Sequence, residues 1–245
     1  MNIGRSGKTK DIFLSERSNY MCGRFSQTKK KQDIKKRFNL ERVPENLPEF
    51  YNIAPQQTAP VVLNAFPSEL ALARFGLVPS WSKEEKSAYS MINARAETIM
   101  EKPTYKRLIK SKRCLVIADG FYEWQKKVDK KIPYRIFLKN DEPFAFAGIW
   151  DRWGEGENEF YSFSIITTTP NKLMATIHDR MPVILEPEDE SVWLQDSTPI
   201  ERVLSMLRSY PAEKMVAYSV STLVNSPSNN SPEVIQYCHS RESSD

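Results

Sequence analysis

The sequence predicts a single α+β domain in which short strands outnumber helices. The chain has 245 residues, of which 40% are hydrophobic and 11% aromatic, enough to bury one substantial core. No internal repeat divides the sequence. Short runs rich in Val, Ile, Leu and Phe alternate with turn residues, which is typical of strands, and fewer segments have the pattern of helices.

The expected elements follow from local pattern in chain order. Residues 29–38 (KKKQDIKKRF) are predicted to form a basic amphipathic helix, with Ile34 and Phe38 on one face and the lysines in solvent. Residues 51–55 are extended or turn-like, because Pro55 disfavours helix at the residue before it. Strands are predicted over 61–63, 70–75, 114–118, 121–124, 133–138, 144–150, 162–168, 183–185 and 216–220. Further helices are predicted over 104–110, 171–177, 188–194 and 200–207.

Asp119-Gly120 is predicted to be the turn of a hairpin that pairs strand 114–118 with strand 121–124.

Cysteine content, the length of apolar runs and net charge disfavour several classes of protein. The three cysteines, Cys22, Cys114 and Cys238, are odd in number and far apart, which disfavours a zinc site or a disulfide framework and favours a reducing compartment. We therefore expect no metal and no cofactor. Apolar runs fall short of the roughly 20 residues that span a bilayer, so we expect a cytoplasmic protein with no membrane partner. The net charge of +4 permits a polyanionic partner.

Residues 1–20 carry many charges and only a short apolar run, so they do not resemble a secretory signal. Asp11 and Glu16 disfavour a transit peptide. We expect residues 1–20 to be a disordered leader or a mis-assigned gene start, with an expression scar or an ordinary disordered tail as the alternatives. Residues 238–245 are expected to be a disordered tail.

Cys22 is the first candidate for chemistry. If the working chain begins there, residue 22 has a free α-amine beside its thiol. An α-amine has a pKa near 7.7–8.0, so roughly a tenth of it is neutral and nucleophilic at pH 7. Such a 1,2-aminothiol attacks an aldehyde through nitrogen and closes a thiazolidine through sulfur. The alternative is a small buried hydrophobic cysteine.

Several polar and aromatic residues further along the chain are candidates for binding a nucleic acid. Trp81, beside Lys83 and Lys86, is suited to stack on a base next to a cationic groove, although a tryptophan is more often part of a core. Asn93, Arg95 and Glu97 alternate, so an extended backbone would put them on one face. An amide and a guanidinium together suit a sugar-phosphate, and a salt-bridged edge strand is the alternative. The candidates in this group are Trp81, Asn93, Arg95 and Glu97.

Two further residues are candidates for proton transfer. Glu123 lies between aromatic neighbours, where partial desolvation would raise the pKa of its carboxyl, and a solvent-facing glutamate is the alternative. His178 is the one plausible imidazole acid or base, because the other of the two histidines, His239, lies in a polar tail. A capped structural histidine is the alternative for His178.

Eight ordered blocks together resemble the SOS-response-associated peptidase (SRAP) family over residues 21–235. They are MCGRF, YNIAP, GLVPSW, INARAET, ADGFYEW, FAGIW, IITTTPN and IHDRMP. Any one of these blocks alone would be weak, and their shared order makes the resemblance specific. It implies a SRAP domain over residues 21–237, with a largely antiparallel, barrel-like β core and peripheral helices.

The resemblance also implies a function in the DNA damage and SOS responses. Family members crosslink an N-terminal cysteine to abasic sites in single-stranded DNA, and Cys22 matches that cysteine. Asn93 matches the asparagine that holds the opened sugar, Glu123 the acid/base, and His178 the histidine that assists ring opening. Arg24 and Arg95 match arginines that grip the DNA backbone, and Trp81 lies where aromatics stack beside the lesion. These matches are made on residues 22, 24, 81, 93, 95, 123 and 178.

The family also has a proposed autoproteolytic activity that exposes the cysteine, which suggests peptidase, hydrolase and lyase-like chemistry. We expect a nucleoid-associated monomer. Phe75 stands where many relatives have Trp, a departure expected to affect packing. The residues ahead of Met21 would block the reaction if retained, because the nitrogen of Cys22 would be an amide. Two other classes stay open: an N-terminal-nucleophile cysteine peptidase or amidohydrolase, and a noncatalytic single-stranded-DNA-binding module.

Overall fold

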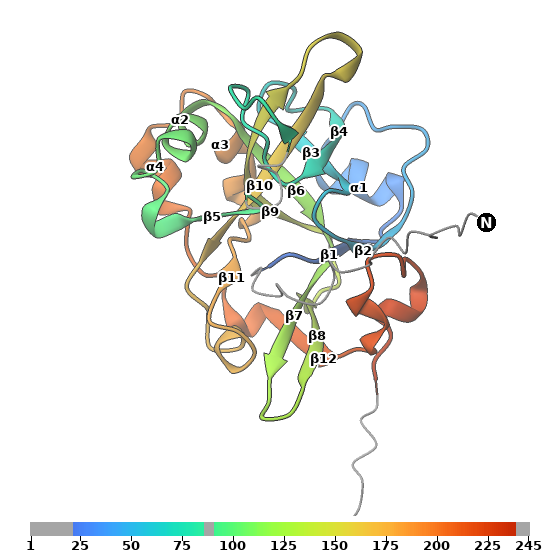
Figure 1. Ribbon diagram of the computed structural model, residues 1–245. Coiled ribbons are helices and arrows are strands. Elements are labelled where there is room, and N and C mark those ends of the chain that lie inside the picture. The colour runs from blue at the N-terminus through green and yellow to red at the C-terminus, as the bar shows by residue number, and fades with distance from the viewer. Residues whose placement is uncertain (1–21, 86–90, 239–245) are drawn as a thin grey trace, which may run out of the picture.

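The computed structural model describes residues 22–85 and 91–238. The leader expected over residues 1–20 lies outside the described residues, as do Lys86, His239 and the tail beyond residue 238. Two β layers form the body of the molecule, and helices cover one of them (Figure 1).

Five strands close into a small barrel. Their hydrogen-bonded order is β10-β4-β3-β6-β9, and β9 pairs back with β10. All of these pairs are antiparallel except β10 with β4. Two short strands extend from β10, β5 in parallel and β11 antiparallel. The predicted α+β fold with a largely antiparallel, barrel-like core is therefore confirmed. The strands are β3 (Thr58–Leu63), β4 (Leu70–Phe75), β5 (Asn93–Arg95), β6 (Arg113–Ala118), β9 (Phe144–Trp153), β10 (Phe160–Thr168) and β11 (Met181–Pro182).

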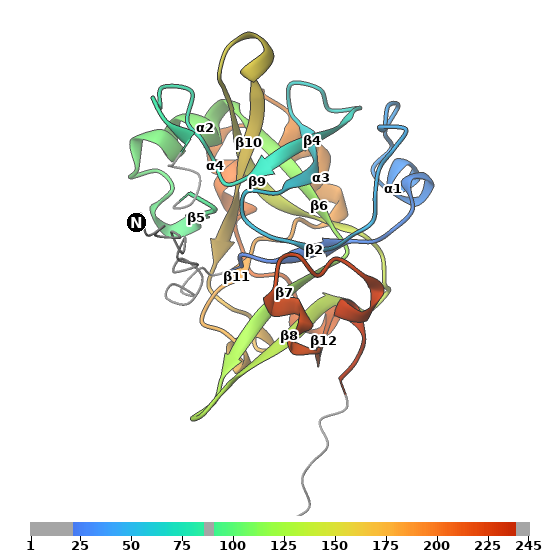
Figure 2. The same cartoon turned by 45° about the vertical axis from the view of Figure 1, so that its right-hand side comes forward.

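The second layer is a five-stranded antiparallel sheet beside the barrel (Figure 2). Its order is β12-β8-β7-β1-β2, so the first strand of the chain lies inside the sheet and not at its edge. This position places residues 22–24 against β7. The strands are β1 (Phe25–Gln27), β2 (Phe50–Ile53), β7 (Gly120–Lys126), β8 (Lys131–Leu138) and β12 (Met215–Ser219).

Alternating side chains of the barrel strands build two apolar clusters. One set, which includes Val116, packs with Phe25 and Phe121 of the five-stranded sheet. The other set, which includes Leu115, packs under the helices, where Trp193 is fully buried. Because neighbouring strand residues face opposite sides, the continuous apolar runs in the sequence serve both clusters.

The helices cover the barrel side away from the five-stranded sheet, as their buried residues show. The helices predicted over 29–38, 104–110, 188–194 and 200–207 are confirmed, and Ile34 is fully buried as expected. The helices are α1 (Lys31–Arg37), α2 (Pro103–Ser111), α3 (Pro187–Leu194) and α4 (Ile200–Ser205). Short 3-10 helices are η2 (Ala96–Thr98), η3 (Gly156–Asn158), η4 (Met174–Thr176), η5 (Ala212–Lys214), η6 (Thr222–Asn225) and η7 (Pro232–Ile235).

The hairpin predicted at Asp119-Gly120 is wrong. β6 pairs with β3 and β9 in the barrel, whereas β7 pairs with β1 and β8 in the other sheet. The carboxylate of Asp119 is buried, and it accepts hydrogen bonds from Ser26 Oγ (2.6 Å) and from the backbone N–H of Thr28 (2.9 Å). Asp119 therefore anchors β1 where the chain passes from one layer to the other.

Two smaller predictions also differ from the structure. The helix predicted over 171–177 is limited to the 3-10 turn η4, because the Asn171 side chain accepts from the backbone N–H of Met174 and caps this short turn. The strand predicted over 183–185 is reduced to a single bridge between Phe146 and Ile184, and the short strand β11 lies just before it. In the part of the chain that the structure describes, no helix is long and apolar enough to cross a bilayer.

Candidate active site

Cys22 lies at the entrance of β1, 3% exposed, with its backbone in the left-handed region at φ 46°. A non-glycine residue rarely adopts this conformation, so the chain turns sharply here at some cost in strain. The backbone N–H of Cys22 donates to Glu123 Oε1 at 2.5 Å. The pairing of Phe25 with Phe121, between β1 and β7, brings these residues together across 101 positions of sequence.

Glu123 lies on β7 and is 2% exposed. It is two residues from Phe121, so its side chain faces the apolar cluster between the layers. Burial raises the pKa of the Glu123 carboxyl, although His178 and the hydrogen bonds from Cys22 act in the opposite direction. The predicted desolvation of Glu123 is confirmed, and the alternative of a solvent-facing glutamate is wrong.

Glu123→Gln should raise the stability of the folded chain at neutral pH. Because the folded-state pKa is raised above the unfolded value of about 4.3, the native state binds the proton more tightly, and the free energy of unfolding falls as pH rises through this interval. Thermal unfolding between pH 5 and pH 8 should show a gain for the variant that shrinks toward acid pH. Glu97→Gln is the control, since a hydrogen bond from Arg180 lowers the pKa of Glu97. A Glu123→Gln variant that is less stable than wild type at pH 8 would contradict this expectation.

His178 lies across the same carboxylate. Its Nε2 is 3.9 Å from Glu123 Oε2, and the ring is 20% exposed. The backbone N–H of Arg180 donates to Nδ1 at 3.2 Å, so the neutral ring carries its proton on Nε2, which faces Glu123. Asp179 Oδ1 lies 3.0 Å from Nδ1 and would accept from a protonated ring.

The thiol of Cys22 shares this enclosed environment. Burial raises the pKa of the Cys22 thiol well above its ordinary value, and the Glu123 carboxylate adds to the effect, whereas Arg180 opposes it. The resting sulfur is therefore protonated. A reaction through sulfur requires a neighbouring base, and Glu123 is within hydrogen-bonding range of Cys22.

Asn93 is the first residue of β5, which pairs in parallel with β10, and it lies opposite Ile165. Its Nδ2 is buried and has no hydrogen-bond partner among the residues that the structure describes. Leaving a buried amide donor unsatisfied is unfavourable, so this nitrogen is suited to donate to a ligand oxygen. Arg95, two residues further along the strand, is exposed.

Glu97 does not continue this face, so the predicted alternation is wrong at its last position. The strand ends at Arg95, and Glu97 lies in η2. Its carboxylate accepts from Arg180 Nη1 (2.7 Å) and Nη2 (2.8 Å). Arg180 Nη2 also donates to the backbone oxygen of Thr167 at 2.8 Å, which ties the segment of His178 to β10 beside β5.

Trp81 is 68% exposed in the loop that follows β4. The loop is held on both sides of the ring: the backbone N–H of Ser80 donates to Asp151 at 2.9 Å, and Trp153 Nε1 donates to the backbone oxygen of Ser82 at 2.7 Å. Trp81 is therefore a fixed, solvent-facing aromatic, and the alternative of a core tryptophan is wrong.

Arg24 lies away from Glu123. It packs with Trp124, its guanidinium carbon 5.8 Å from the ring centroid, and β7 directs Trp124 to the opposite face from Glu123. Arg24 Nη1 donates to Asn52 Oδ1 (2.8 Å) and to the backbone oxygen of Val224 (2.5 Å). Burial lowers the pKa of Arg24 to about 10. Much of its donor capacity is used within the protein, and its expected contact with DNA stays a prediction.

The structure thus brings Cys22, Glu123 and His178 together, and it leaves Arg24 and Trp81 in separate surroundings. Arg180 was missed by sequence reasoning, because its partners are distant in the chain. Its only signal was its place two residues after His178. Asp151 was also missed, although it is fully buried and receives Ser80 N–H and Arg107 Nη2.

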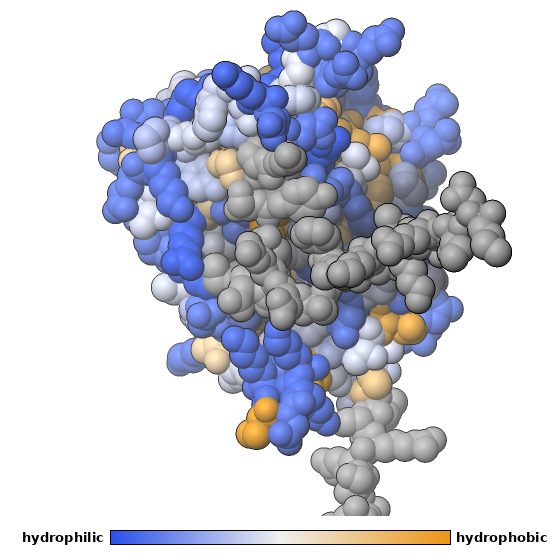
Figure 3. All heavy atoms as spheres, in the orientation of Figure 1, coloured by the Kyte–Doolittle hydropathy of each residue, from blue (hydrophilic) through white to orange (hydrophobic). Residues whose placement is uncertain are grey.

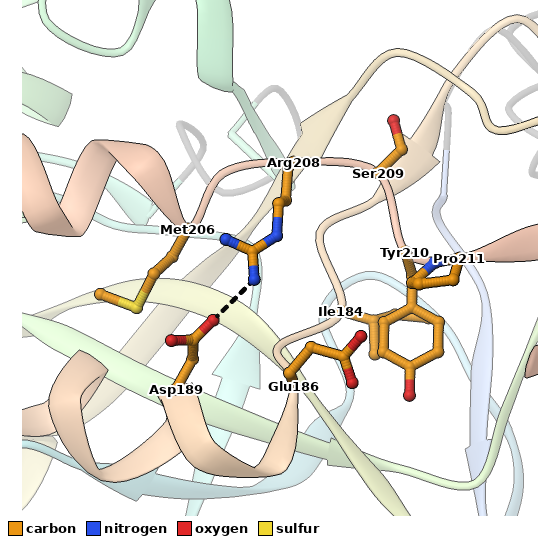
Figure 4. A pocket seen from close by; sticks show the side chains of 8 residues that line it. All are labelled: Ile184, Glu186, Asp189, Met206, Arg208, Ser209, Tyr210 and Pro211. Carbon is orange, nitrogen blue, oxygen red and sulfur yellow. Dashed lines mark hydrogen bonds and ion pairs between the residues drawn. The ribbon is translucent and has the colours of Figure 1, made fainter.

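The hollows elsewhere on the described surface do not coincide with Cys22. One is a cavity of about 10 Å³ under Tyr210 and beside the ion pair of Arg208 with Asp189, with room for about one water molecule (Figure 4). Another is an open groove beside α1 that includes Arg42 and Leu70. Within residues 22–85 and 91–238, no group of three or more His, Cys, Asp or Glu side chains is arranged to hold a metal.

Comparisons with known proteins agree on one family. A family model described as SOS response associated peptidase (SRAP) matches residues 21–227. The abasic site processing protein YoqW of Bacillus subtilis is 48% identical over 224 residues, covering 88% of this chain and 99% of that protein. The abasic site processing protein HMCES of Xenopus tropicalis is 38% identical over 218 residues, covering 75% of this chain and 64% of that protein.

A solved structure shows the same fold. A crystal structure of a protein from Bacteroides thetaiotaomicron matches with a TM-score of 0.80 and 33% identity, covering 89% of this chain and all (100%) of that one. A second, from Bordetella bronchiseptica, has a TM-score of 0.70 and 26% identity, covering 82% of this chain and 100% of that one.

Proposed function

Because the chain belongs to the SOS response associated peptidase (SRAP) family, we propose that it senses abasic sites in single-stranded DNA and binds them covalently. Its curated relatives are named abasic site processing proteins. One observation carries the proposed chemistry: the nitrogen of Cys22 lies 2.5 Å from the Glu123 carboxylate, with the His178 ring on the other oxygen of the same group. An acid/base pair therefore adjoins the atom that must attack.

The reaction begins with the sugar. An abasic deoxyribose is mostly a closed hemiacetal, so a proton must leave its hydroxyl and another must reach the ring oxygen before the aldehyde is exposed. His178 and Glu123 are the groups assigned to these transfers. Burial raises the pKa of the Glu123 carboxyl, so this group holds a proton more readily than an exposed glutamate and is suited to donate it.

The crosslink then forms through nitrogen and sulfur in turn. The neutral α-amine of Cys22 adds to C1′ and gives a carbinolamine, and proton donation to its hydroxyl expels water and leaves an imine. Cys22 Sγ adds to the same carbon as its proton passes to the imine nitrogen, closing a thiazolidine. One water leaves in total, and no oxidant or reductant is required. The adduct shields the lesion.

Asn93 and Arg95 orient the substrate in this proposal. The unsatisfied Nδ2 of Asn93 is suited to donate to a sugar oxygen, and the exposed guanidinium of Arg95, on the same strand, to a phosphate. Holding the aldehyde near the attacking amine turns a bimolecular step into an effectively unimolecular one. Single-stranded DNA is favoured as the partner, because an unpaired strand bends into a site without the cost of opening a duplex.

Trp81→Ala should weaken noncovalent binding of single-stranded DNA by roughly 10- to 100-fold, since a stacked base contributes about 1–3 kcal/mol. The melting temperature should barely change, because the ring is 68% exposed. Fluorescence anisotropy with a labelled oligonucleotide measures the affinity. Phe66→Ala is the matched control, an aromatic that is 46% exposed between β3 and β4. Equal losses in both variants would contradict a stacking role for Trp81.

A second activity acts on the chain itself. The strained backbone of Cys22 and the contact of its amide nitrogen with Glu123 favour hydrolysis of the peptide bond before residue 22. Water adds to the carbonyl carbon of that bond, and the Glu123 carboxyl donates a proton to the departing nitrogen, which leaves a new carboxyl group and the free amine of Cys22. This autoproteolysis would uncover the amine that the crosslink needs.

We expect the protein to act as a nucleoid-associated monomer, in keeping with DNA as its partner.

The direct test of the proposed function is formation of an SDS-stable adduct. A chain that begins at Cys22 is mixed with an oligonucleotide that carries one abasic site, and a matched oligonucleotide without the lesion is the control. Absence of an adduct at saturating DNA would refute covalent sensing. A noncatalytic DNA-binding module would bind both oligonucleotides and crosslink neither.

A further inference from the structure

The hairpin of β7 and β8 projects from the body of the molecule (Figures 1 and 2). Its end, residues 126–131, has the sequence KKVDKK and is exposed at every position. We call its lysines the lysine tip, defined as Lys126, Lys127, Lys130 and Lys131. Figure 3 shows mainly hydrophilic residues on this projecting end. None of the eight family blocks includes it.

The lysine tip concentrates like charges at the end of the hairpin. Lys126 and Lys131 are directly paired across the strands, and the backbone N–H of Lys127 donates to the oxygen of Lys130 at 2.8 Å in the turn. Like charges opposite one another destabilise a strand pair. Asp129 is the one acidic residue in the segment. Four lysines and one aspartate within six residues give this exposed end a net positive charge, which suits a polyanion.

The lysine tip and the candidate active site are connected through strand β7. Glu123 and Lys126 lie on the same strand three residues apart, roughly 10 Å at 3.4 Å per residue. At the base of the hairpin, Gln125 Nε2 donates to the backbone oxygen of Thr176 at 2.6 Å, two residues before His178. The hairpin is thus tied to the segment that carries His178. Its charged end lies near the site along β7, with the Lys126 side chain on the face of the strand opposite Glu123.

We propose that the lysine tip binds the phosphate backbone of the DNA strand beside the lesion. The inference rests on the proposed function, because it takes the strand at Glu123 to be DNA. Ammonium groups on flexible stems bind phosphate as point charges and read no sequence. The tip therefore holds the strand whether or not a lesion is present, and it lengthens the DNA footprint on one side of the reacting sugar.

The test replaces all four tip lysines by Gln and measures noncovalent affinity for a lesion-free single strand at several salt concentrations. The slope of log K against log salt should fall by about 0.7 for each phosphate that the variant no longer neutralises, and affinity at low salt should fall by at least roughly tenfold. The matched control removes four lysines from the α1 region, which lies on a different part of the molecule (Figure 1): Lys30, Lys31, Lys35 and Lys36. Its slope should stay near that of wild type.

A second measurement separates a local contact from a general charge effect. Abasic oligonucleotides are extended on the 5′ or on the 3′ side of the lesion, and the rate of adduct formation is compared at subsaturating DNA. Wild type should gain rate from extension on one side, and the tip variant should lose that gain while it keeps the rate of the shortest oligonucleotide. An unchanged salt slope, or equal losses in the tip and α1 variants, would overturn the inference even if wild type forms the adduct. Absence of an adduct with wild type would refute the proposed chemistry. The salt slope would still show whether the lysine tip binds the phosphate backbone.

Discussion

Cys22→Ala should abolish the SDS-stable adduct with an abasic oligonucleotide, with a loss of more than about a thousandfold, and should leave noncovalent binding of single-stranded DNA largely intact. The substitution keeps the α-amine but removes the sulfur that closes the thiazolidine, so any imine that forms stays open to hydrolysis. The substitution removes the thiol contact with Glu123 but keeps the backbone N–H of residue 22 that donates to the same carboxylate, so the fold around the site should persist. Denaturing gels and mass spectrometry of the adduct measure the outcome.

Two further variants sharpen this result. Cys22→Ser should give a product that survives denaturation only after borohydride reduction, since the hydroxyl is a poorer nucleophile and the imine can be trapped as an amine. Cys238→Ala is the control, because Cys238 is an exposed free cysteine far along the chain. An adduct that persists undiminished in Cys22→Ala without reduction would refute the assignment of sulfur. A peptidase would instead cleave peptide substrates and form no adduct.

Retention of any residue ahead of Cys22 should block crosslinking completely. An acylated nitrogen is an amide whose lone pair is delocalised, so it cannot add to an aldehyde at a useful rate. The folded site should survive, because an amide N–H at residue 22 already donates to Glu123 in the structure. Chemical acetylation of the α-amine in a chain that begins at Cys22 should therefore eliminate the adduct and leave the affinity for intact single strands nearly unchanged.

Intact mass spectrometry of the same preparations identifies the first residue of the reactive chains. We expect every crosslinked molecule to begin at Cys22. An adduct on a chain whose mass includes residues 1–21 would contradict the proposed mechanism. Glu123→Gln, tested for loss of those residues during expression, distinguishes self-cleavage from removal by another protease.

Much of the fold could be predicted from local pattern, because strands such as β3, β4 and β6 are runs of β-branched and apolar residues bounded by turn residues. The connection between the two β layers, from β6 to β7, could not be predicted from local pattern. Asp119-Gly120 has the composition of a hairpin turn, but the partners of the Asp119 carboxylate are Ser26 and Thr28, more than 90 positions away. Tertiary contacts decided the path of the chain there.

The candidate site was predictable as separate residues and not as an arrangement. The setting of Glu123 among aromatics indicated desolvation, and the scarcity of histidine singled out His178. Their approach to Cys22 depends on the position of β1 inside the sheet, which no spacing in the sequence reveals. Arg180 could not be found for the same reason, since it joins Glu97 and Thr167 through folding alone.

The interior position of β1 has a mechanical consequence. A DNA strand joined to residue 22 would pull on β1, which is hydrogen-bonded to β7 on one side and to β2 on the other. Within β1, Ser26 also donates to the buried Asp119 carboxylate. Tension along β1 acts parallel to the strand, so the hydrogen bonds to β7 and to β2 are loaded in shear. They therefore resist together and do not break one at a time from one end. If the proposed adduct forms, a pull on the DNA would therefore be shared by the β1–β7 and β1–β2 hydrogen bonds.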